Sequence, residues 1–489
     1  MATEIPANAS SFTLRELAFA VGGELFRAED EGARVVGIVT DSRVVRPGNV
    51  FVALRGDSFD GHAFVEAAIL RGATAVIAER GRGVHYDGAA MILVDDGLRA
   101  FGLVARDHLR RWRRARAGSS RTAALTGSAG KTTTKELTAA ILAAVGPCHA
   151  TVGNLNNRIG VPAVGLAVSD ERFFVCELGM SVPGEIAALT GIVEPDVAAL
   201  LNVGVAHAEG FGGSRARIAR EKGAIFDGLA TGGIAVFGID DESARGEVAR
   251  TTARHVGFGR SMDADVRLLA REPMAYGGSR VTVGRGGETF DVILSVPGEA
   301  AALDLVAAIA IADATAGVAI SCEIIKASLT SWRAPAGRAV IIQLADDVLV
   351  VDDSYNANPA SMRSSLATVR EIKRAGRRRA LVVLGEMREL GPLSEREHDE
   401  LGDVVAREGV DLLIGCGGAA DIVLRRATKE GVPVRFAADA AEAGAIVAAE
   451  ARPGDVVLFK GSRGASVERA LAVLVVRHPP VATRDAREP

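Results

Sequence analysis

The sequence predicts an α/β protein with three domains, each built around a parallel sheet. Its 489 residues correspond to about three domains at roughly 150 residues per domain. Short β-branched runs alternate with alanine-rich helical stretches along the chain, a pattern typical of parallel sheets covered by helices. This pattern breaks at residues 112–120 and 331–337, which predicts domains over residues 1–115, 116–333 and 334–489.

Ten short apolar runs are expected to form the strands. In chain order they are 35–39, 50–54, 75–78, 122–126, 173–178, 197–203, 348–352, 380–385, 412–415 and 456–459. Ligands of parallel α/β sheets collect at the carboxyl ends of the strands. We therefore expect the functional residues directly after these runs.

Composition excludes several classes of protein. The net charge of −4, from 57 basic and 61 acidic residues, provides no global basic field for nucleic acid. No stretch offers about 18 clean apolar residues, so no membrane insertion is expected, and no basic segment precedes an apolar core near the N-terminus, so no leader is expected. The four cysteines lie far apart without metal-ligand spacing, which fits a reducing cytoplasm.

A glycine-rich segment after the run 122–126 predicts a site for nucleotide phosphates. Its members are Gly127, Ser128, Ala129, Gly130, Lys131, Thr132 and Thr133. Glycines let backbone N–H groups turn toward phosphates, Lys131 neutralises phosphate oxygens, and the Thr132 hydroxyl can hold Mg²⁺. The usual pattern carries another glycine where Leu125 stands, so the loop is a shorter variant. Only seven lysines stand against fifty arginines, which argues against Lys131 being surface filler.

Polar residues follow the apolar runs 173–178 and 197–203, so we expect them at the same edge of the sheet. Glu177 lies at the end of the run 173–178, where a buried carboxylate needs a partner, and Mg²⁺ on a triphosphate would supply one. His207 follows the run 197–203; alone it would be a core histidine, but its place beside the expected Mg²⁺ favours a ligand role. Lys222, in a helix expected over 216–226, would by default be a surface lysine.

These features resemble the central domain of the Mur ligases, the ATP-dependent amide-bond ligases of peptidoglycan precursor synthesis. The resemblance is carried by residues 126–133, Glu177, 202–207, 209–212 and 221–226. It implies catalytic roles for Lys131, Glu177, His207 and Lys222, and carbamylation of Lys222. It implies ATP and two Mg²⁺ ions as cofactors, the metals being arranged by Thr132, Glu177, His207 and Lys222.

Three further stretches, 352–362, 153–162 and 384–398, resemble the family members that join D-alanyl-D-alanine to UDP-N-acetylmuramoyl-tripeptide. They imply an ADP-forming ligase that acts through an acyl phosphate on these small molecules, as a cytoplasmic monomer. The implied architecture is an N-terminal UDP-sugar-binding α/β domain, a central P-loop ATPase-type parallel sheet, and a C-terminal Rossmann-like domain. The C-terminal domain would close over ATP and bind the acceptor.

The same resemblance assigns the remaining site residues to three groups. With the phosphate loop, ATP would be held by Arg338 and Asp353. The UDP-sugar would be held by Ser42, Arg43, His62, Asn156 and Asn157. The acceptor and the closing loop would involve Tyr355, Asn356, Asn358, Ser462 and Arg463.

Two departures from the family pattern fall near the expected adenine and ribose. Gly238 stands where members usually carry Asn. Ala300, Ala301 and Asp304 replace a His-Asn pair and a further Asn. The adenine contacts therefore stay open, as does the third residue of the peptide substrate.

Two kinds of alternative also remain. A sister ligase that adds the third amino acid, or a folate polyglutamylating enzyme, is the nearest, and the loop 355–358 argues against both. A catalytically silent nucleotide-binding paralogue is motivated by the altered adenine positions. The intact Lys131, Glu177, His207 and Lys222 argue against it.

Overall fold

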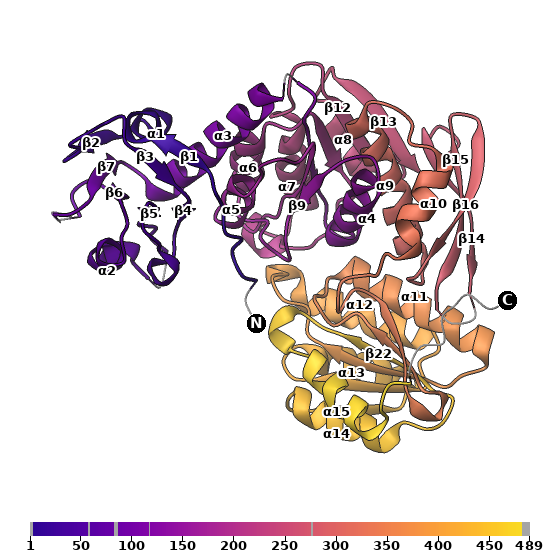
Figure 1. Ribbon diagram of the computed structural model, residues 1–489. Helices are drawn as coiled ribbons and strands as arrows, with labels where there is room; N and C mark the ends of the chain where they lie inside the picture. Colours follow the sequence, from indigo (N-terminus) through magenta and orange to yellow (C-terminus); the bar gives the residue numbers. More distant parts are fainter. Residues whose placement is uncertain (1–2, 57–58, 83–86, 117, 275–276, 482–489) are drawn as a thin grey trace.

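The computed structural model describes residues 3–56, 59–82, 87–116, 118–274 and 277–481. Three main sheets, each formed by one continuous part of the chain, are covered by helices (Figure 1). The prediction of an α/β fold is confirmed. Within the described ranges, no helix is long and apolar enough to cross a membrane.

The N-terminal sheet has five strands in the order β2-β7-β6-β5-β4, with β2 antiparallel to β7 and the others parallel. Its elements, with the separate pair β1-β3, are β1 (Ser11–Thr13), α1 (Leu14–Val21), β2 (Glu24–Phe26), β3 (Arg34–Val36), β4 (Ile38–Val39), β5 (Val50–Val52), α2 (Val65–Leu70), β6 (Ala75–Glu79), β7 (Ala90–Val94) and α3 (Gly97–Ala115). The expected run 35–39 is divided between β3 and β4. Gly37 lies between them with a φ of +81°, a left-handed conformation that ends the first strand.

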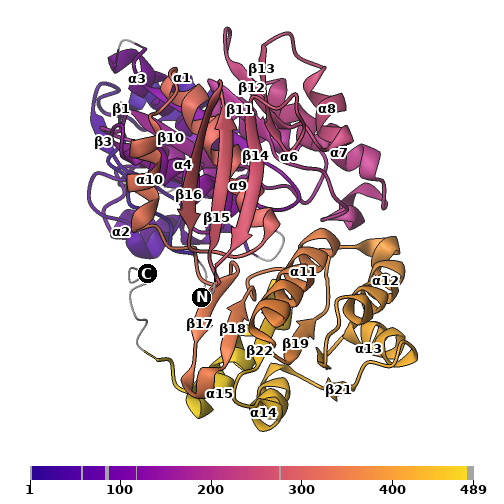
Figure 2. The ribbon, with the colours of Figure 1, turned by 90° about the vertical axis from the view of Figure 1, so that its right-hand side faces the viewer.

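The central sheet has nine strands in the order β16-β15-β14-β13-β12-β11-β8-β10-β9. Its elements are β8 (Arg121–Thr126), α4 (Lys131–Ala143), β9 (Cys148–Ala150), α5 (Gly160–Leu166), β10 (Phe173–Glu177), α6 (Glu185–Val193), β11 (Val197–Leu200), α7 (Arg215–Gly223), β12 (Ile234–Gly238), α8 (Glu242–Val248), β13 (Arg254–Gly259), β14 (Val266–Pro273), β15 (Ser279–Arg285), β16 (Glu288–Leu294), α9 (Glu299–Ala316) and α10 (Cys322–Thr330). From β9 to β14 all neighbours are parallel, whereas β15 and β16 extend the sheet as an antiparallel hairpin (Figure 2). The ten predicted runs do not include these two strands.

The C-terminal sheet has six strands in the order β17-β18-β22-β19-β20-β21, all parallel except β17. Its elements are β17 (Val340–Gln343), β18 (Leu349–Asp352), α11 (Pro359–Gly376), β19 (Ala380–Gly385), α12 (Ser394–Arg407), β20 (Leu412–Cys416), α13 (Ala420–Lys429), β21 (Val434–Ala437), α14 (Ala440–Glu450), β22 (Val456–Lys460) and α15 (Glu468–Arg477). Because helices cover both faces of this sheet, its inner strands are apolar, as in the fully buried β19.

Helix α9 forms the centre of the core on one face of the central sheet. It is 18 residues long, rich in alanine, and ends at Gly317 in the left-handed conformation. Its small side chains let it pack closely against α4 and against β13 and β14. Since α9 runs back along the sheet from the phosphate loop, its first turns face the loop and its last turns face the opposite sheet edge.

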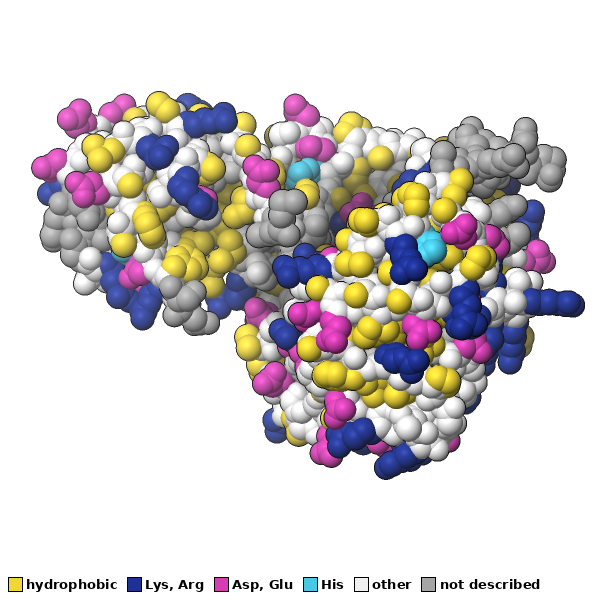
Figure 3. Space-filling view, turned by 90° about the horizontal axis from the view of Figure 1, so that it is seen from below, with side chains coloured by type: hydrophobic (Ala, Val, Ile, Leu, Met, Phe, Trp, Pro, Cys, Tyr) yellow, Lys and Arg dark blue, Asp and Glu magenta, His cyan; other side chains and the backbone are white. Residues whose placement is uncertain are grey.

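The domains meet through different kinds of contact. The N-terminal core is continuous with the central domain through Ala163 and Leu166 of α5, which pack with the residues of α3. The N-terminal domain nevertheless forms a separate lobe, with a hollow between it and the C-terminal domain (Figure 3). The C-terminal domain lies below the central one (Figure 1), where Arg271 of β14 forms an ion pair with Glu371 of α11 at 2.5 Å.

Candidate active site

A cavity of about 790 Å³ lies between the central and C-terminal domains. The phosphate loop, Glu177 and His207 line it from the central domain, and Asp353 and Arg463 are among the residues that line it from the C-terminal domain. The structure therefore brings most of the predicted nucleotide, metal and closure residues around one space, at the carboxyl ends of the parallel strands, where ligands of such sheets collect. Gly127 and Lys222 are predicted site residues that do not line this cavity.

The phosphate loop joins β8 to α4 as the sequence predicts. Gly130 has a φ of +81° and forms the N-cap of α4, so the start of this helix faces the cavity. A Cβ on Gly130 would overlap with Oδ1 of Asp304. Both the left-handed backbone and the approach of Asp304 therefore require glycine here.

Asn202 holds the outer part of the loop. Its Oδ1 accepts hydrogen bonds from the backbone N–H groups of Ser128 at 3.1 Å and Ala129 at 2.9 Å, and its Nδ2 donates to the carbonyl of Ala129 at 3.1 Å. Asn202 lies two residues beyond the end of β11, next to β8 in the sheet. The neighbouring strand thus fixes the loop conformation.

Two lysines share one backbone acceptor beneath the loop. Nζ of Lys131 donates to the carbonyl oxygen of Gly127 at 2.7 Å, and Nζ of Lys222 donates to the same oxygen at 3.0 Å. Lys222 is only 1% exposed; burial lowers its pKa well below the usual value, and the charge of Lys131 lowers it further. Desolvation also lowers the pKa of Lys131, although Glu177 opposes that shift. Burial and the charge of Lys131 therefore both disfavour the ammonium form of Lys222 relative to that of an exposed lysine.

Glu177 ends β10 with its carboxylate at the edge of the cavity. Its side chain is almost fully buried, and both oxygens are engaged: Oε2 accepts from the Thr132 hydroxyl at 3.0 Å and Oε1 from Nδ2 of Asn156 at 2.8 Å. Nη2 of Arg338, from the C-terminal domain, donates to the same Thr132 oxygen at 3.1 Å. A carboxylate and a hydroxyl therefore lie side by side next to the phosphate loop.

His207 contacts the C-terminal domain. Its ring Nδ1 is hydrogen-bonded to a carboxylate oxygen of Glu389, and the backbone N–H of Glu209 donates to the carbonyl of Glu389 at 3.0 Å. His207 lines the cavity, as predicted, but its bonded partner belongs to the opposite domain. His207 thus connects the edge of the central sheet to the C-terminal domain.

The C-terminal wall is organised by a buried ion pair. Nζ of Lys460, at the end of β22, lies 2.5 Å from Oδ2 of Asp353 and donates to the carbonyl of Asn356 at 3.2 Å. The hydroxyl of Ser365 donates to the same carboxylate at 2.6 Å. These bonds fix the loop after β18 against the neighbouring strand, so Asp353 and Asn356 keep their places in the cavity wall.

Three aromatic and polar groups complete this wall. The guanidinium of Arg338 lies 4.2 Å from the centroid of the Tyr355 ring and that of Arg463 lies 5.7 Å away, so two cations approach Tyr355. Oγ of Ser462 accepts a hydrogen bond from the N–H of Arg388 at 2.8 Å. Nδ2 of Asn358 reaches across to the carbonyl of Ser128 at 3.2 Å.

Comparison with known proteins fits this geometry. Three protein-family models match the chain. They are "Mur ligase family, catalytic domain" over residues 34–108, "Mur ligase middle domain" over residues 125–312, and "Mur ligase, glutamate ligase domain" over residues 337–463. The UDP-N-acetylmuramoyl-tripeptide--D-alanyl-D-alanine ligase of Escherichia coli (strain K12) is 34% identical over 95% of this chain and 98% of its own. The chain belongs to the Mur ligase family. The ligase of the same name from Bacillus subtilis (strain 168) is 31% identical over 95% of this chain and 98% of its own.

Solved Mur ligase structures share the fold. The crystal structure of MurF from Acinetobacter baumannii superposes with a TM-score of 0.85 at 31% identity, over 96% of this chain and all of the other. The crystal structure of MurF ligase from Thermotoga maritima in complex with ADP gives a TM-score of 0.79 at 32% identity, over 90% and 97% of the two chains. The three-domain α/β architecture is thus that of known Mur ligases.

The N-terminal residues expected to hold the UDP-sugar lie on a different part of this Mur ligase from the cavity lining. Arg43 is exposed and pairs with Asp41 at 2.7 Å in the short turn that begins at Ser42. His62 is buried: its Nε2 accepts from the N–H of Glu79 at 2.9 Å, so Nδ1 carries the proton that is donated to Asp60 at 2.6 Å. Both ring nitrogens of His62 are therefore engaged within the N-terminal domain.

The other two residues of that predicted group lie in the cavity itself. Asn156 bonds to Glu177, as described, and Oδ1 of Asn157 accepts from the N–H groups of Ile159 at 3.1 Å and Gly160 at 2.8 Å at the start of α5. Asn157 therefore stabilises the helix that joins the N-terminal core, and Asn156 supports the carboxylate next to the loop.

Sequence reasoning missed three residues of the Mur ligase site. Asn202 and Glu389 stood inside motifs that were recognised, but their bonding partners lie 74 residues away at Ser128 and 182 residues away at His207. Lys460 lies just before the predicted Ser462 and Arg463, and its place as the last residue of a buried strand, in a chain with seven lysines, is the signal that could have found it.

Proposed function

We propose that this Mur ligase joins D-alanyl-D-alanine to UDP-N-acetylmuramoyl-tripeptide and converts ATP to ADP and phosphate. The observation that carries the proposal is the cavity in which the phosphate loop faces the loop that contains Asp353, Asn356 and Asn358. The relatives from Escherichia coli and Bacillus subtilis, which are 34% and 31% identical along nearly the whole chain, bear the name of this ligase. More distant proteins of known structure, such as a Mycobacterium tuberculosis folylpolyglutamate synthase at 16% identity, share only the fold with this chain.

The proposed reaction has two steps. A carboxylate oxygen of the tripeptide attacks the γ-phosphorus of ATP, the bond from that phosphorus to the bridging oxygen breaks, and ADP leaves. The amine of D-alanyl-D-alanine then attacks the acyl carbon, the amine loses a proton, and phosphate leaves the tetrahedral intermediate. In phosphoryl transfer the protein mainly positions the reactants and neutralises charge, and such alignment contributes about 7–11 kcal/mol.

The described residues support these tasks. Lys131 and the N-terminus of α4 face the place of the phosphates, and Arg338 reaches Thr132 from the other domain. We assign acceptor binding and closure to Tyr355, Asn356, Asn358, Ser462 and Arg463, all of which line the cavity. Contact of the C-terminal domain with the loop would exclude water from the acyl phosphate.

Magnesium fits the oxygen pair of Thr132 and Glu177. Within the described part of the chain, no group of three or more His, Cys, Asp and Glu side chains is placed to hold a metal by itself. Mg²⁺ commonly takes one or two protein oxygens and completes its shell with phosphates and water, so one carboxylate and one hydroxyl suffice. When bound, the metal would neutralise phosphate charge. We propose His207 and a carbamylated Lys222 as the groups that arrange a second ion.

Carbamylation of Lys222 is supported by its surroundings. The pKa of Lys222 is lowered by burial and by Lys131, so its uncharged amine is available to add to CO₂ with loss of a proton. The product would carry a negative charge next to the Lys131 ammonium. Carbamylation would therefore replace the repulsion between two ammonium groups by an attraction between opposite charges. It would also place carbamate oxygens, which can bind a metal ion, beneath the phosphate loop.

We further propose that residues 1–115 bind the UDP-sugar, with Ser42, Arg43, His62, Asn156 and Asn157 contributing. The exposed Arg43 is the member of this group best suited to a diphosphate. His62, with both nitrogens engaged, would act by holding its loop in place. The hollow between the N-terminal and C-terminal lobes leaves room for the sugar and its peptide (Figure 3).

The central domain over 116–333 and the C-terminal domain over 334–489 complete the proposed division. We propose that the chain acts as a cytoplasmic monomer. Its four cysteines are free thiols, which fits a reducing compartment.

The decisive experiment measures phosphate release from MgATP with UDP-N-acetylmuramoyl-tripeptide, with and without D-alanyl-D-alanine, followed by the mass of the sugar product. Release that needs both substrates, with a mass gain of one dipeptide less water, is expected. Release with a single added amino acid would instead indicate a sister ligase. Nucleotide binding without any turnover would favour the silent paralogue, which the unusual Ala300, Ala301 and Asp304 would then explain.

A further inference from the structure

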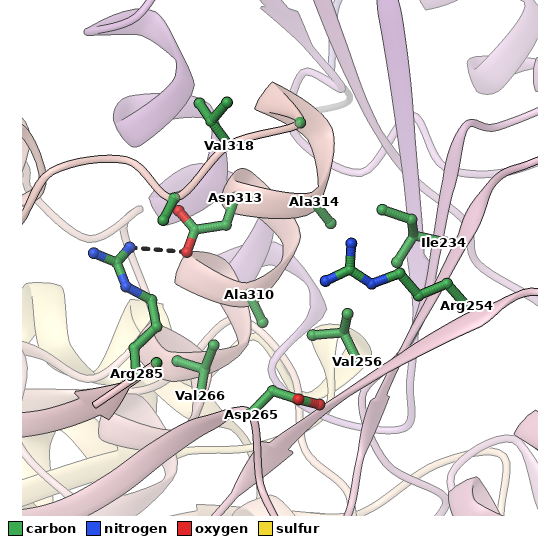
Figure 4. Close-up of a pocket in the computed structure, with 13 residues that line it drawn as sticks. Ile234, Arg254, Val256, Asp265, Val266, Arg285, Ala310, Asp313, Ala314 and Val318 are labelled. Atoms are coloured by element: carbon green, nitrogen blue, oxygen red, sulfur yellow. Dashed lines mark hydrogen bonds and ion pairs between the residues drawn. The ribbon is translucent and has the colours of Figure 1, made fainter. Parts of the chain in front are cut away.

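A second cavity, of about 340 Å³, lies in the central domain away from the proposed active site (Figure 4). It opens between the beginnings of β12, β13 and β14 and the last turns of α9. The two cavities share helix α9 but no lining residue, since Asp304 lines one and Asp313 the other. Its volume is at the lower end of the range for small-molecule sites.

One wall presents a cation that the protein does not neutralise. Arg254, the first residue of β13, is exposed, its side chain extends toward the cavity, and it has no hydrogen-bond or ion-pair partner among the described residues (Figure 4). Arg285 is the contrasting case, because it is only 8% exposed and pairs with Asp313 at 2.8 Å and Glu288 at 2.9 Å. Arg285 thus belongs to the wall, whereas Arg254 is available to an anion.

An acidic group, Asp265, lies at the lower edge of the cavity as Figure 4 shows it. Oδ2 of Asp265 accepts from the N–H of Gly257 at 2.7 Å, which fixes the carboxylate in one orientation. Asp265 and Arg254 form no ion pair with each other: neither appears in a salt bridge within the described chain, and no contact joins them in Figure 4. The cavity therefore offers one unpaired cation and one carboxylate, which is held by Gly257.

The surface between these charges is apolar. It is formed by Ile234, Val256, Val266, Ala310 and Ala314, and Figure 4 shows Arg254 to the right of these side chains and Asp265 below them. Burial of a hydrocarbon side chain against this apolar surface is favourable. A guanidinium binds a carboxylate through paired N–H groups. A carboxylate, an ammonium group and an apolar side chain occur together in an α-amino acid.

We propose that this cavity binds a small apolar α-amino acid in its zwitterionic form. The carboxylate contacts Arg254, the ammonium group contacts Asp265, and the side chain packs on the valine and alanine floor. A nucleotide would leave Asp265 facing phosphate, and a purely apolar ligand would leave both charges without a partner. The site is independent of the proposed ligase reaction, because it shares no residue with the nucleotide cavity.

Titration calorimetry of the full chain with L-valine tests the site directly. Isobutyrate and isobutylamine, which keep the hydrocarbon part of valine and one charge each, serve as matched probes. The variants are Arg254→Gln and Asp265→Asn, and the control is Arg245→Gln, which removes an exposed arginine of α8 outside the cavity. Thermal unfolding of every variant checks that the fold is kept.

We expect one molecule of valine to bind per chain, with an affinity that each cavity variant lowers about tenfold or more and the control leaves unchanged. Isobutyrate and isobutylamine should each bind more weakly than valine. The proposal is overturned if valine does not bind, or if its affinity for both cavity variants equals its affinity for the parent chain, which would place valine elsewhere. Isobutyrate that binds as tightly as valine would also overturn it, since the site would then be a simple anion site.

Discussion

Asn358 and Ser128 join the two domains that form the active site. Nδ2 of Asn358 donates to the carbonyl oxygen of Ser128 at 3.2 Å, while its Oδ1 accepts from the N–H of Ser361 at 2.9 Å. One side chain thus caps α11 and contacts the phosphate loop. The C-terminal domain therefore contacts the backbone of the phosphate loop directly.

We predict that the two roles of Asn358 can be separated by substitution. Asn358→Ser keeps a capping oxygen but is too short to reach Ser128, so kcat should fall about fivefold, the cost of one hydrogen bond. Asn358→Asp also keeps the cap but places a negative charge beside the loop, so kcat should fall more than about tenfold. Steady-state kinetics and thermal unfolding measure these effects. A large fall in the melting temperature of either variant would mean that the cap, and not the domain contact, was lost.

Lys222 supplies the second prediction. Lys222→Ala should lose most ligase activity, because the side chain beneath Gly127 would be missing. If the functional group is a carbamate, a short carboxylate such as acetate should partly restore the rate. Lys326→Ala, which removes an exposed lysine of α10 that pairs with Glu323, is the matched control and should keep full activity. Activity of Lys222→Ala equal to that of the parent chain would exclude the carbamate.

The sequence predicts those parts of the site that are formed by residues close together in the chain. The phosphate loop is one continuous segment between a strand and a helix, and Glu177 ends a buried strand, so their places follow from the parallel sheet. The acidic end of β10 and the loop after β8 meet because the two strands are neighbours in the sheet.

The parts that sequence missed depend on distant partners. The pair of Lys460 and Asp353 spans 107 residues, and nothing near either residue specifies the other. His207 turns toward Glu389 because of how the C-terminal domain packs, which no motif in the central domain records. The hairpin of β15 and β16 could have been found, because Gly286 and Gly287, both at positive φ, separate two strands of alternating burial.

The buried pair of Lys460 and Asp353 gives the third prediction. The two side chains are 2% and 15% exposed, so removing the cation leaves a carboxylate with much of its solvation missing. Lys460→Met should lower the free energy of unfolding by about 3 kcal/mol, measured by urea denaturation. Lys373→Met is the control: its pair with Asp411 is 27% and 36% exposed, and the expected loss is no more than about 1 kcal/mol. Equal losses in the two variants would show that burial does not set the cost.

Asp304 leads to a prediction about pH. Its carboxyl lies against Gly130, and burial raises its pKa from the ordinary 3.8 to about 8, with Thr134 and Arg338 opposing the shift. Between these two values the folded chain holds a proton that the unfolded chain has released. The free energy of unfolding should therefore fall as pH rises from about 4 to about 8, and the contribution of Asp304 should be constant above that range.

Asp304→Asn removes this titration while it keeps the shape of the side chain. Urea denaturation at about pH 5, pH 7 and pH 9 should show the variant gaining stability relative to the parent chain as pH rises. Asp263→Asn, a change of an exposed aspartate in the same domain, should show no such trend. A constant difference between Asp304→Asn and the parent chain at all three pH values would mean that Asp304 is already ionised in the folded state. The chain would then hold an anion beside its phosphate loop, and Arg338, which opposes the pKa shift, would be the cation that stabilises it.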